Sequence, residues 1–172
     1  MKELTLFILT TTFLLACNSV SDSKVEESAP ANEAGVFSLV IHGGAGTILK
    51  ANMTEEQEKA YEQVLTEALD IGEEILQADG AATEAVIEVI KHMEDSPLFN
   101  AGKGAVFNSD AANEMDASIM RGYDQQAGAV GGVSNIKNPI EAAFAVMTKS
   151  EHVLLTGQGA ESFAVSVGID TI

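Results

Sequence analysis

Two short glycine-rich segments hold most of the groups in this sequence that could do chemistry. The first is residues 42–46, His-Gly-Gly-Ala-Gly, which follows an apolar run at 36–41. Glycine lets the backbone approach another group closely and present amide N–H donors, so such a loop can hold an anion. The Gly-Lys-Ser/Thr ending of a phosphate-binding loop and the GxGxxG spacing of a dinucleotide-binding loop are both absent. The alternative is a tight strand exit where the glycines only allow close packing.

The second segment is residues 96–104, Ser-Pro-Leu-Phe-Asn-Ala-Gly-Lys-Gly. Proline, glycine and apolar residues in a short connection predict a shaped, partly buried loop. Asn100 can donate and accept hydrogen bonds, and Glu94 together with nearby backbone carbonyls offers the oxygen ligands that a hard cation prefers. The alternative is a rigid turn in which Asn100 bonds to its own backbone. The residues alone leave both interpretations open.

Histidine, cysteine and net charge exclude several other functions. His42, His92 and His152 lack the i, i+4 spacing of a helical zinc site. Cys17 is the only cysteine, so neither an internal disulfide nor a zinc site built from several cysteines can form. The 172 residues include 26 acidic and 9 basic side chains, a net charge of −17. Nucleic acid and anionic lipid headgroups are therefore not expected partners.

Alternating helical and strand patterns must position the two glycine-rich segments. A strand is predicted at 36–41, and Thr54 with Gln57 has the spacing of a capping box that starts a helix ending near Gly80. A second helix is predicted from 83 to 93, because Pro97 bars its continuation. Strands are predicted at 105–107, 115–120, 127–130 and 152–156, a helix capped by Asn138 from 138 to 149, and a last helix after 157.

The N-terminal segment has the pattern of an export signal. The apolar run at 4–16 is shorter than the roughly 20 residues that a membrane-spanning helix needs, so residues 1–16 are predicted to be a signal peptide. Leu-Leu-Ala-Cys at 14–17 resembles a lipobox, which predicts lipidation of Cys17; the alternative is an ordinary signal and a chance cysteine. Residues 17–35 are polar and aperiodic, as in a tether. The expected localisation is that of an exported bacterial lipoprotein facing the periplasm, held at the membrane only by its lipid anchor.

Taken in order, several segments of this sequence resemble one enzyme family. The segments are 41–46, 97–107 and 114–120, followed by 127–133, 138–139 and 157–161. They are similar to the isoaspartyl peptidase/plant-type L-asparaginase family of N-terminal-nucleophile hydrolases. The resemblance implies an α/β (α+β) fold, an αββα four-layer sandwich made as a precursor that cuts itself into α and β subunits. Residues 36–172 would form the α-type half, incomplete at its C-terminus.

The same resemblance implies the chemistry and the site residues. A threonine at the start of the β subunit would hydrolyse β-aspartyl dipeptides or the side-chain amide of L-asparagine through an acyl-enzyme. No strand of the Thr-Val-Gly type is found in this chain, so no catalytic nucleophile is expected here. Asn100, Gly43 and Gly44 would support the site. The expected ligands of a structural sodium ion, mostly through backbone carbonyls, are Met93, Glu94, Ser96, Phe99, Ala101 and Lys103.

The resemblance also implies the partners of the chain. These would be the β subunit of the same precursor, a second αβ unit in a dimer, and a small aspartyl substrate, with no catalytic cofactor. The alternative function is a lipid-anchored, non-catalytic module that binds an anionic ligand through its glycines or pairs with a separate chain. Ligand binding by this chain alone would favour the module.

Overall fold

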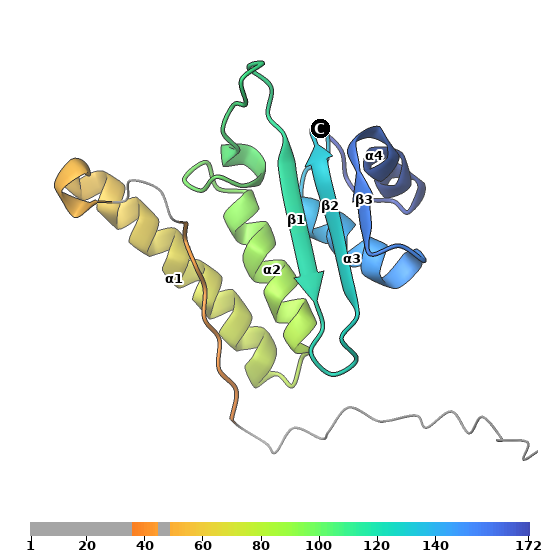
Figure 1. Ribbon diagram of the computed structural model, residues 1–172. Coiled ribbons are helices and arrows are strands. Elements are labelled where there is room, and N and C mark those ends of the chain that lie inside the picture. The colour runs from red at the N-terminus through yellow and green to blue at the C-terminus, as the bar shows by residue number, and fades with distance from the viewer. Residues whose placement is uncertain (1–35, 45–48) are drawn as a thin grey trace, which may run out of the picture. The chain divides into compact units, whose positions relative to one another are not determined.

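A three-stranded sheet organises the part of the chain described by the computed structural model, residues 36–44 and 49–172 (Figure 1). Strands β1 (Met115–Met120) and β2 (Ala127–Val133) form an antiparallel pair, and β2 pairs in parallel with β3 (Leu154–Thr156). The connection from β2 to β3 runs through a helix, as a parallel pair requires. The mixed α/β class expected from the sequence is therefore confirmed for these residues.

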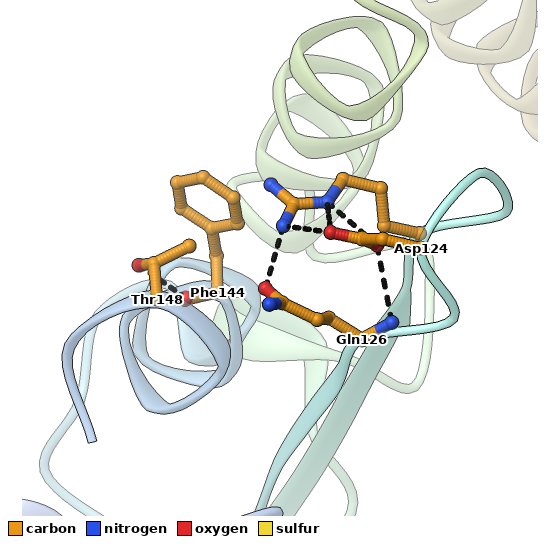
Figure 2. A network of polar contacts seen from close by, with 5 residues as sticks. Asp124, Gln126, Phe144 and Thr148 are labelled. Carbon is orange, nitrogen blue, oxygen red and sulfur yellow. Dashed lines mark hydrogen bonds and ion pairs between the residues drawn. The ribbon is translucent and has the colours of Figure 1, made fainter. Parts of the chain in front are cut away.

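The turn between β1 and β2 is closed by charged and amide side chains. Arg121 Nε donates to both carboxylate oxygens of Asp124 at 3.1 Å, and Arg121 Nη2 donates to Gln126 Oε1 at 2.5 Å (Figure 2). Gln125 adopts a positive φ of 58° within this turn. Because turn length and register are coupled, these contacts favour one pairing of the two strands.

A bulge near the start of β1 adjusts the register of the sheet. Pairing shifts between Met115 and Ala117, and Asp116 Oδ1 accepts a hydrogen bond of 2.8 Å from the backbone N–H of Gly132, whose φ is +60°. The extra residue lies in β2, and it lets Val130 and Val133, three residues apart, share the buried face of that strand. That face packs against the helix that follows β2.

Helix α3 (Pro139–Lys149) covers this face of the sheet and forms the core with it. Small side chains bring the helix close to β2, because an added Cβ at Gly128 would overlap the backbone of α3. Burying these apolar side chains provides the main stabilisation, about 25 cal/mol per Å² removed from water. The side chains of this core that are at most 1% exposed include Val130, Val133, Ile136, Ile140, Ala142, Ala143 and Val146.

Two antiparallel helices precede the sheet in the chain. Helix α1 (Glu55–Gln77) begins with the predicted capping box, and Asp79 turns the chain with a φ of 60° after it ends. Helix α2 (Ala82–Glu94) ends before Pro97, as expected. Polar side-chain contacts connect α2 to its neighbours: His92 Nε2 lies 3.1 Å from Glu67 Oε2 of α1, and Lys91 Nζ forms an ion pair of 2.8 Å with Glu141 Oε1 of α3.

Three of the predicted elements are wrong in detail. Residues 36–41 are extended, but no described strand pairs with them, so they are not a strand. Residues 105–107 form only an isolated bridge between Phe107 and Asn113. Asn138 does not cap α3, because its side chain donates instead to Asp95 Oδ1 at 3.2 Å. Short 3-10 helices at Lys50–Asn52 and Gly102–Gly104, and helix α4 (Gly157–Ser166), complete the described elements.

Candidate functional site

A cavity of about 400 Å³ brings the two glycine-rich segments together. One wall is the extended segment 39–44, which includes Gly43 and Gly44. The opposite walls are α2 and residues 99–101, which include Asn100. The cavity is mainly apolar, with the side chains of Val89, Ile90, Met93 and Phe99 in its lining. The sequence segments that could carry chemistry are therefore neighbours in space.

The extended segment 36–44 reaches the cavity by packing one face on the helices. Alternate residues are partly buried, and Leu39 sits where an added Cβ at Gly72 of α1 would meet it at 2.5 Å. The other face is open, and Val40 is 90% exposed. At the end of the segment, His42 Nδ1 accepts a hydrogen bond of 3.2 Å from Gly44 N–H. This contact assigns His42 to shaping the glycine turn.

The loop that carries Asn100 is held by hydrogen bonds from several directions. The hydroxyl of Tyr61 in α1 donates to the Leu98 carbonyl at 2.9 Å, and Ser96 Oγ accepts from Leu98 N–H at 3.3 Å. Asn100 Oδ1 accepts from Val106 N–H at 3.0 Å. The side-chain oxygen of Asn100 is thus held by the backbone, as the interpretation of a rigid turn predicts. Asn100 nevertheless lines the cavity.

Backbone carbonyls of this loop crowd around two glycines. Gly102 has a φ of +50°, and an added Cβ there would meet the Glu94 Cβ at 2.7 Å and its carbonyl oxygen closer still. At Gly104 an added Cβ would meet the Pro97 carbonyl oxygen at 2.9 Å and that of Phe99 closer still. No group of three or more metal-binding side chains occurs among the described residues. The carbonyl oxygens of Glu94, Pro97 and Phe99 therefore lie against the backbone of these two glycines.

The Glu94 side chain does not face this loop. It is only 3% exposed, and its Oε1 accepts a hydrogen bond of 3.1 Å from Ile140 N–H in the first turn of α3. Its Oε2 is buried and has no hydrogen-bond partner. Desolvation raises the pKa of Glu94 from 4.5 to about 7, although the hydrogen bond from Ile140 opposes the shift. Glu94 thus takes the capping role expected of Asn138, and only its backbone carbonyl remains a candidate cation ligand.

The remaining candidates are dispersed or lie elsewhere. His92 pairs with Glu67 in the helices, and His152 is exposed next to β3, so the described histidines do not form one site. Lys103 is exposed in the 3-10 helix, which leaves its carbonyl as the relevant group. Cys17, with the predicted signal and tether, lies outside the described residues. Sequence analysis missed the role of Tyr61, because a tyrosine at helical spacing indicates only burial.

A family model described as asparaginase matches residues 35–172 of this chain. The isoaspartyl peptidase of Salmonella typhimurium is 47% identical over 131 residues, which are 76% of this chain and 42% of that protein. The plant-type L-asparaginase of Pyrococcus horikoshii is 47% identical over 133 residues, 77% of this chain and 42% of that protein. The isoaspartyl peptidase/L-asparaginase of Bos taurus is 43% identical over 134 residues, which are 78% of this chain and 42% of that protein. The chain thus spans about two fifths of these relatives.

The predicted localisation as a membrane-anchored bacterial lipoprotein is wrong. It is contradicted by the relatives, which are similarly named enzymes from bacteria, archaea and cattle, none of them named as a lipoprotein. In the part of the chain that is described, no helix is long and apolar enough to cross a bilayer. The prediction rested on a short apolar run and a four-residue lipobox pattern, which both lie outside the described residues.

The comparisons and the fold agree with the resemblance seen in the sequence. The match covers both cavity-lining segments, the sheet and the four α-helices. The fold class is confirmed as that of the N-terminal part of an α/β N-terminal-nucleophile hydrolase. The chain therefore belongs to the asparaginase family that includes the isoaspartyl peptidases and the plant-type L-asparaginases.

Proposed function

We propose that this chain is the α-type part of an amidohydrolase that acts on β-aspartyl (isoaspartyl) dipeptides, on the side-chain amide of L-asparagine, or on both. One observation carries the proposal: Gly43, Gly44 and Asn100 line one cavity in a chain that belongs to this family. The relatives named above are isoaspartyl peptidases and L-asparaginases. Both substrates present the same chemical target, an amide on an aspartyl side-chain carbonyl.

The reaction in this proposal is acyl transfer to a threonine and then to water. A threonine at the start of a β-type part, a partner supplied from outside this chain, attacks the side-chain carbonyl while its own α-amine accepts the proton. The C–N bond then breaks, ammonia or the amino acid leaves with that proton, and water hydrolyses the ester to release aspartate. The carbonyl oxygen gains negative charge and needs hydrogen-bond donors, each typically worth a factor of about 10²–10³ in rate. In this chain Asn100 supports the nucleophile, and the glycines at 43 and 44 let backbone and substrate approach closely.

The proposal includes a structural sodium ion in the loop between α2 and β1. When bound, the ion would draw the loop carbonyls together and stiffen the Asn100 side of the cavity. The carbonyl oxygens of Glu94 and Phe99, two of the proposed ligands, lie close to Gly102 and Gly104 in this loop, which supports the assignment because oxygen ligands suit a hard cation. The proposed ligands, through their backbone carbonyls, are Met93, Glu94, Ser96, Phe99, Ala101 and Lys103.

Exchanging sodium for a bulky organic cation at equal ionic strength is expected to lower the melting temperature. A ligand that binds only the folded state stabilises it, and saturating sodium should raise the midpoint by about 2–5 °C. Lys103→Ala should keep this increment because its carbonyl is unchanged, whereas Gly102→Ala should lose it through the overlap with the Glu94 carbonyl. Differential scanning calorimetry in the two salts measures the melting temperatures of the wild type and of both variants. Equal midpoints for the wild type would contradict a sodium site.

Ammonia release from L-asparagine and aspartate release from β-aspartyl dipeptides test the proposed activity. The 172-residue chain alone should not hydrolyse L-asparagine or β-aspartyl dipeptides measurably. Co-produced with the β-type part of the Salmonella typhimurium relative, it should form a complex that does. The physical reason is that acyl transfer needs a hydroxyl beside a free α-amine, which the proposal places in the β-type part. Robust turnover by the chain alone, or a stable but inactive complex, would contradict the proposal.

A further inference from the structure

Tyr61 connects helix α1 to the Asn100 loop across 37 residues of sequence. Its hydroxyl donates a hydrogen bond of 2.9 Å to the carbonyl of Leu98. Its ring meets the ring of Phe99 edge to face, with centroids 5.8 Å apart and planes at 80°. This edge-to-face arrangement is one of the preferred aromatic geometries. A single side chain thus contacts two consecutive residues immediately before Asn100.

The ring of Phe99 also lies next to Gly43 in the first glycine-rich segment. Phe99 is 5% exposed, and an added Cβ at Gly43 would lie 3.5 Å from its ring and 3.4 Å from the Leu65 side chain. Phe99 and Leu65 therefore form the surface on which Gly43 rests. Tyr61, Phe99 and Gly43 make a continuous series of contacts from α1 to both glycine-rich segments.

Phe99 and Gly43 form a thin wall between two cavities. Both residues line the candidate site of about 400 Å³, and both line a second cavity of about 230 Å³ that Tyr61 and Leu65 also border. Interior side chains normally keep their place because close packing surrounds them. Apolar packing is not directional, so by itself it does not fix the exact position of this wall. A directional contact is needed to set its position, and the Tyr61 hydroxyl supplies one.

We propose that Tyr61 is a positioning residue for the candidate site. It fixes the backbone at Leu98 and the ring of Phe99, and thereby sets the distance between Asn100 and the glycines at 43 and 44. Its local effect follows from the contacts alone. Its effect on cation binding rests on the sodium loop of the proposed function, so the two are tested by separate measurements.

Amide hydrogen exchange tests the local effect without reference to any ligand. Tyr61→Phe keeps the ring and removes only the hydroxyl. Amides of the loop, such as Gly104 and Val106, should exchange about 3- to 10-fold faster, while amides of β2 and α3 should not change. The matched control is Tyr123→Phe, since Tyr123 is 64% exposed in the β1–β2 turn. Unchanged loop exchange, or equal acceleration throughout the protein, would overturn the proposal.

Tyrosine emission tests the link to cation binding. The chain has no tryptophan and two tyrosines, so in Tyr123→Phe all tyrosine emission comes from Tyr61. Because the Tyr61 hydroxyl is bonded to a loop carbonyl, sodium should change this emission saturably, and a bulky organic cation should not. A sodium-dependent melting temperature with silent emission would overturn the link. A melting temperature that does not change with sodium would instead contradict the sodium site of the proposed function. The hydrogen-exchange experiment would still test the role of Tyr61.

Discussion

Gly128→Ala is expected to destabilise the protein by at least about 3 kcal/mol. Gly128 lies in β2 where the strand passes closest to α3. An added Cβ would meet the Met147 Cβ at 2.7 Å, and the Ala143 carbonyl oxygen and the Met147 backbone nitrogen are closer still. Backbone atoms cannot rotate away, so the helix would have to move off the sheet and open the core. Against a typical total of 5–15 kcal/mol, this is a large share of the stability, so the urea midpoint should fall clearly.

Gly159→Ala is the matched control for this prediction. Gly159 lies in α4, and an added Cβ there meets nothing within 4 Å. Alanine favours a helix by up to about 1 kcal/mol over glycine, so this variant should be as stable as the wild type or slightly more so. Urea unfolding followed by circular dichroism measures both. A Gly128→Ala variant within about 1 kcal/mol of the wild type would show that β2 and α3 are not packed as described.

Glu94→Gln is expected to become more stable relative to the wild type as the pH rises. Burial raises the pKa of the folded-state Glu94 carboxyl to about 7, against 4.5 when unfolded. Folding therefore favours the protonated form. The stability that this form contributes is fully present below pH 4.5 and is lost as the pH rises through 7. Across this window the wild type should lose about 3 kcal/mol relative to a variant with a neutral amide at position 94.

The amide in Glu94→Gln can still accept the hydrogen bond from Ile140 N–H, so the variant should keep the start of α3 in place. Unfolding free energies from pH 4.5 to 8 measure the effect, in a bulky organic cation so that sodium binding does not contribute. Glu151→Gln is the control, because Glu151 is exposed. A constant difference between wild type and Glu94→Gln over this range would mean that the carboxylate is solvated or paired.

Local sequence signals determined most of the helices. The capping box of Thr54 and Gln57, the stop before Pro97 and the start at Pro139 all involve residues within one turn of each other. Such signals act through contacts that form whatever the rest of the chain does. The residue types of the two glycine-rich segments are also a local signal, and they indicate close approach of the backbone to another group.

Strands and caps that depend on distant partners could not be determined in this way. The apolar, β-branched run at 36–41 is typical of a buried strand, but a strand also needs a neighbour to pair with, and no described strand pairs with this segment. Asn138 has the residue type of a cap, yet the N–H of Ile140 is taken by Glu94, 46 residues earlier. Sequence spacing shows which groups could bond locally. Burial and proximity decide which of them do.

The candidate site, too, was determined partly by the sequence and partly by the tertiary structure. Residue types and order were enough to identify Gly43, Gly44 and Asn100, and the family to which the chain belongs. Only the tertiary structure shows that these residues share one cavity, that Tyr61 supports the wall between two cavities, and that the Glu94 side chain points away from the loop. The physical reason is that each of these facts depends on a contact between segments far apart in the chain, and local residue patterns do not encode such contacts.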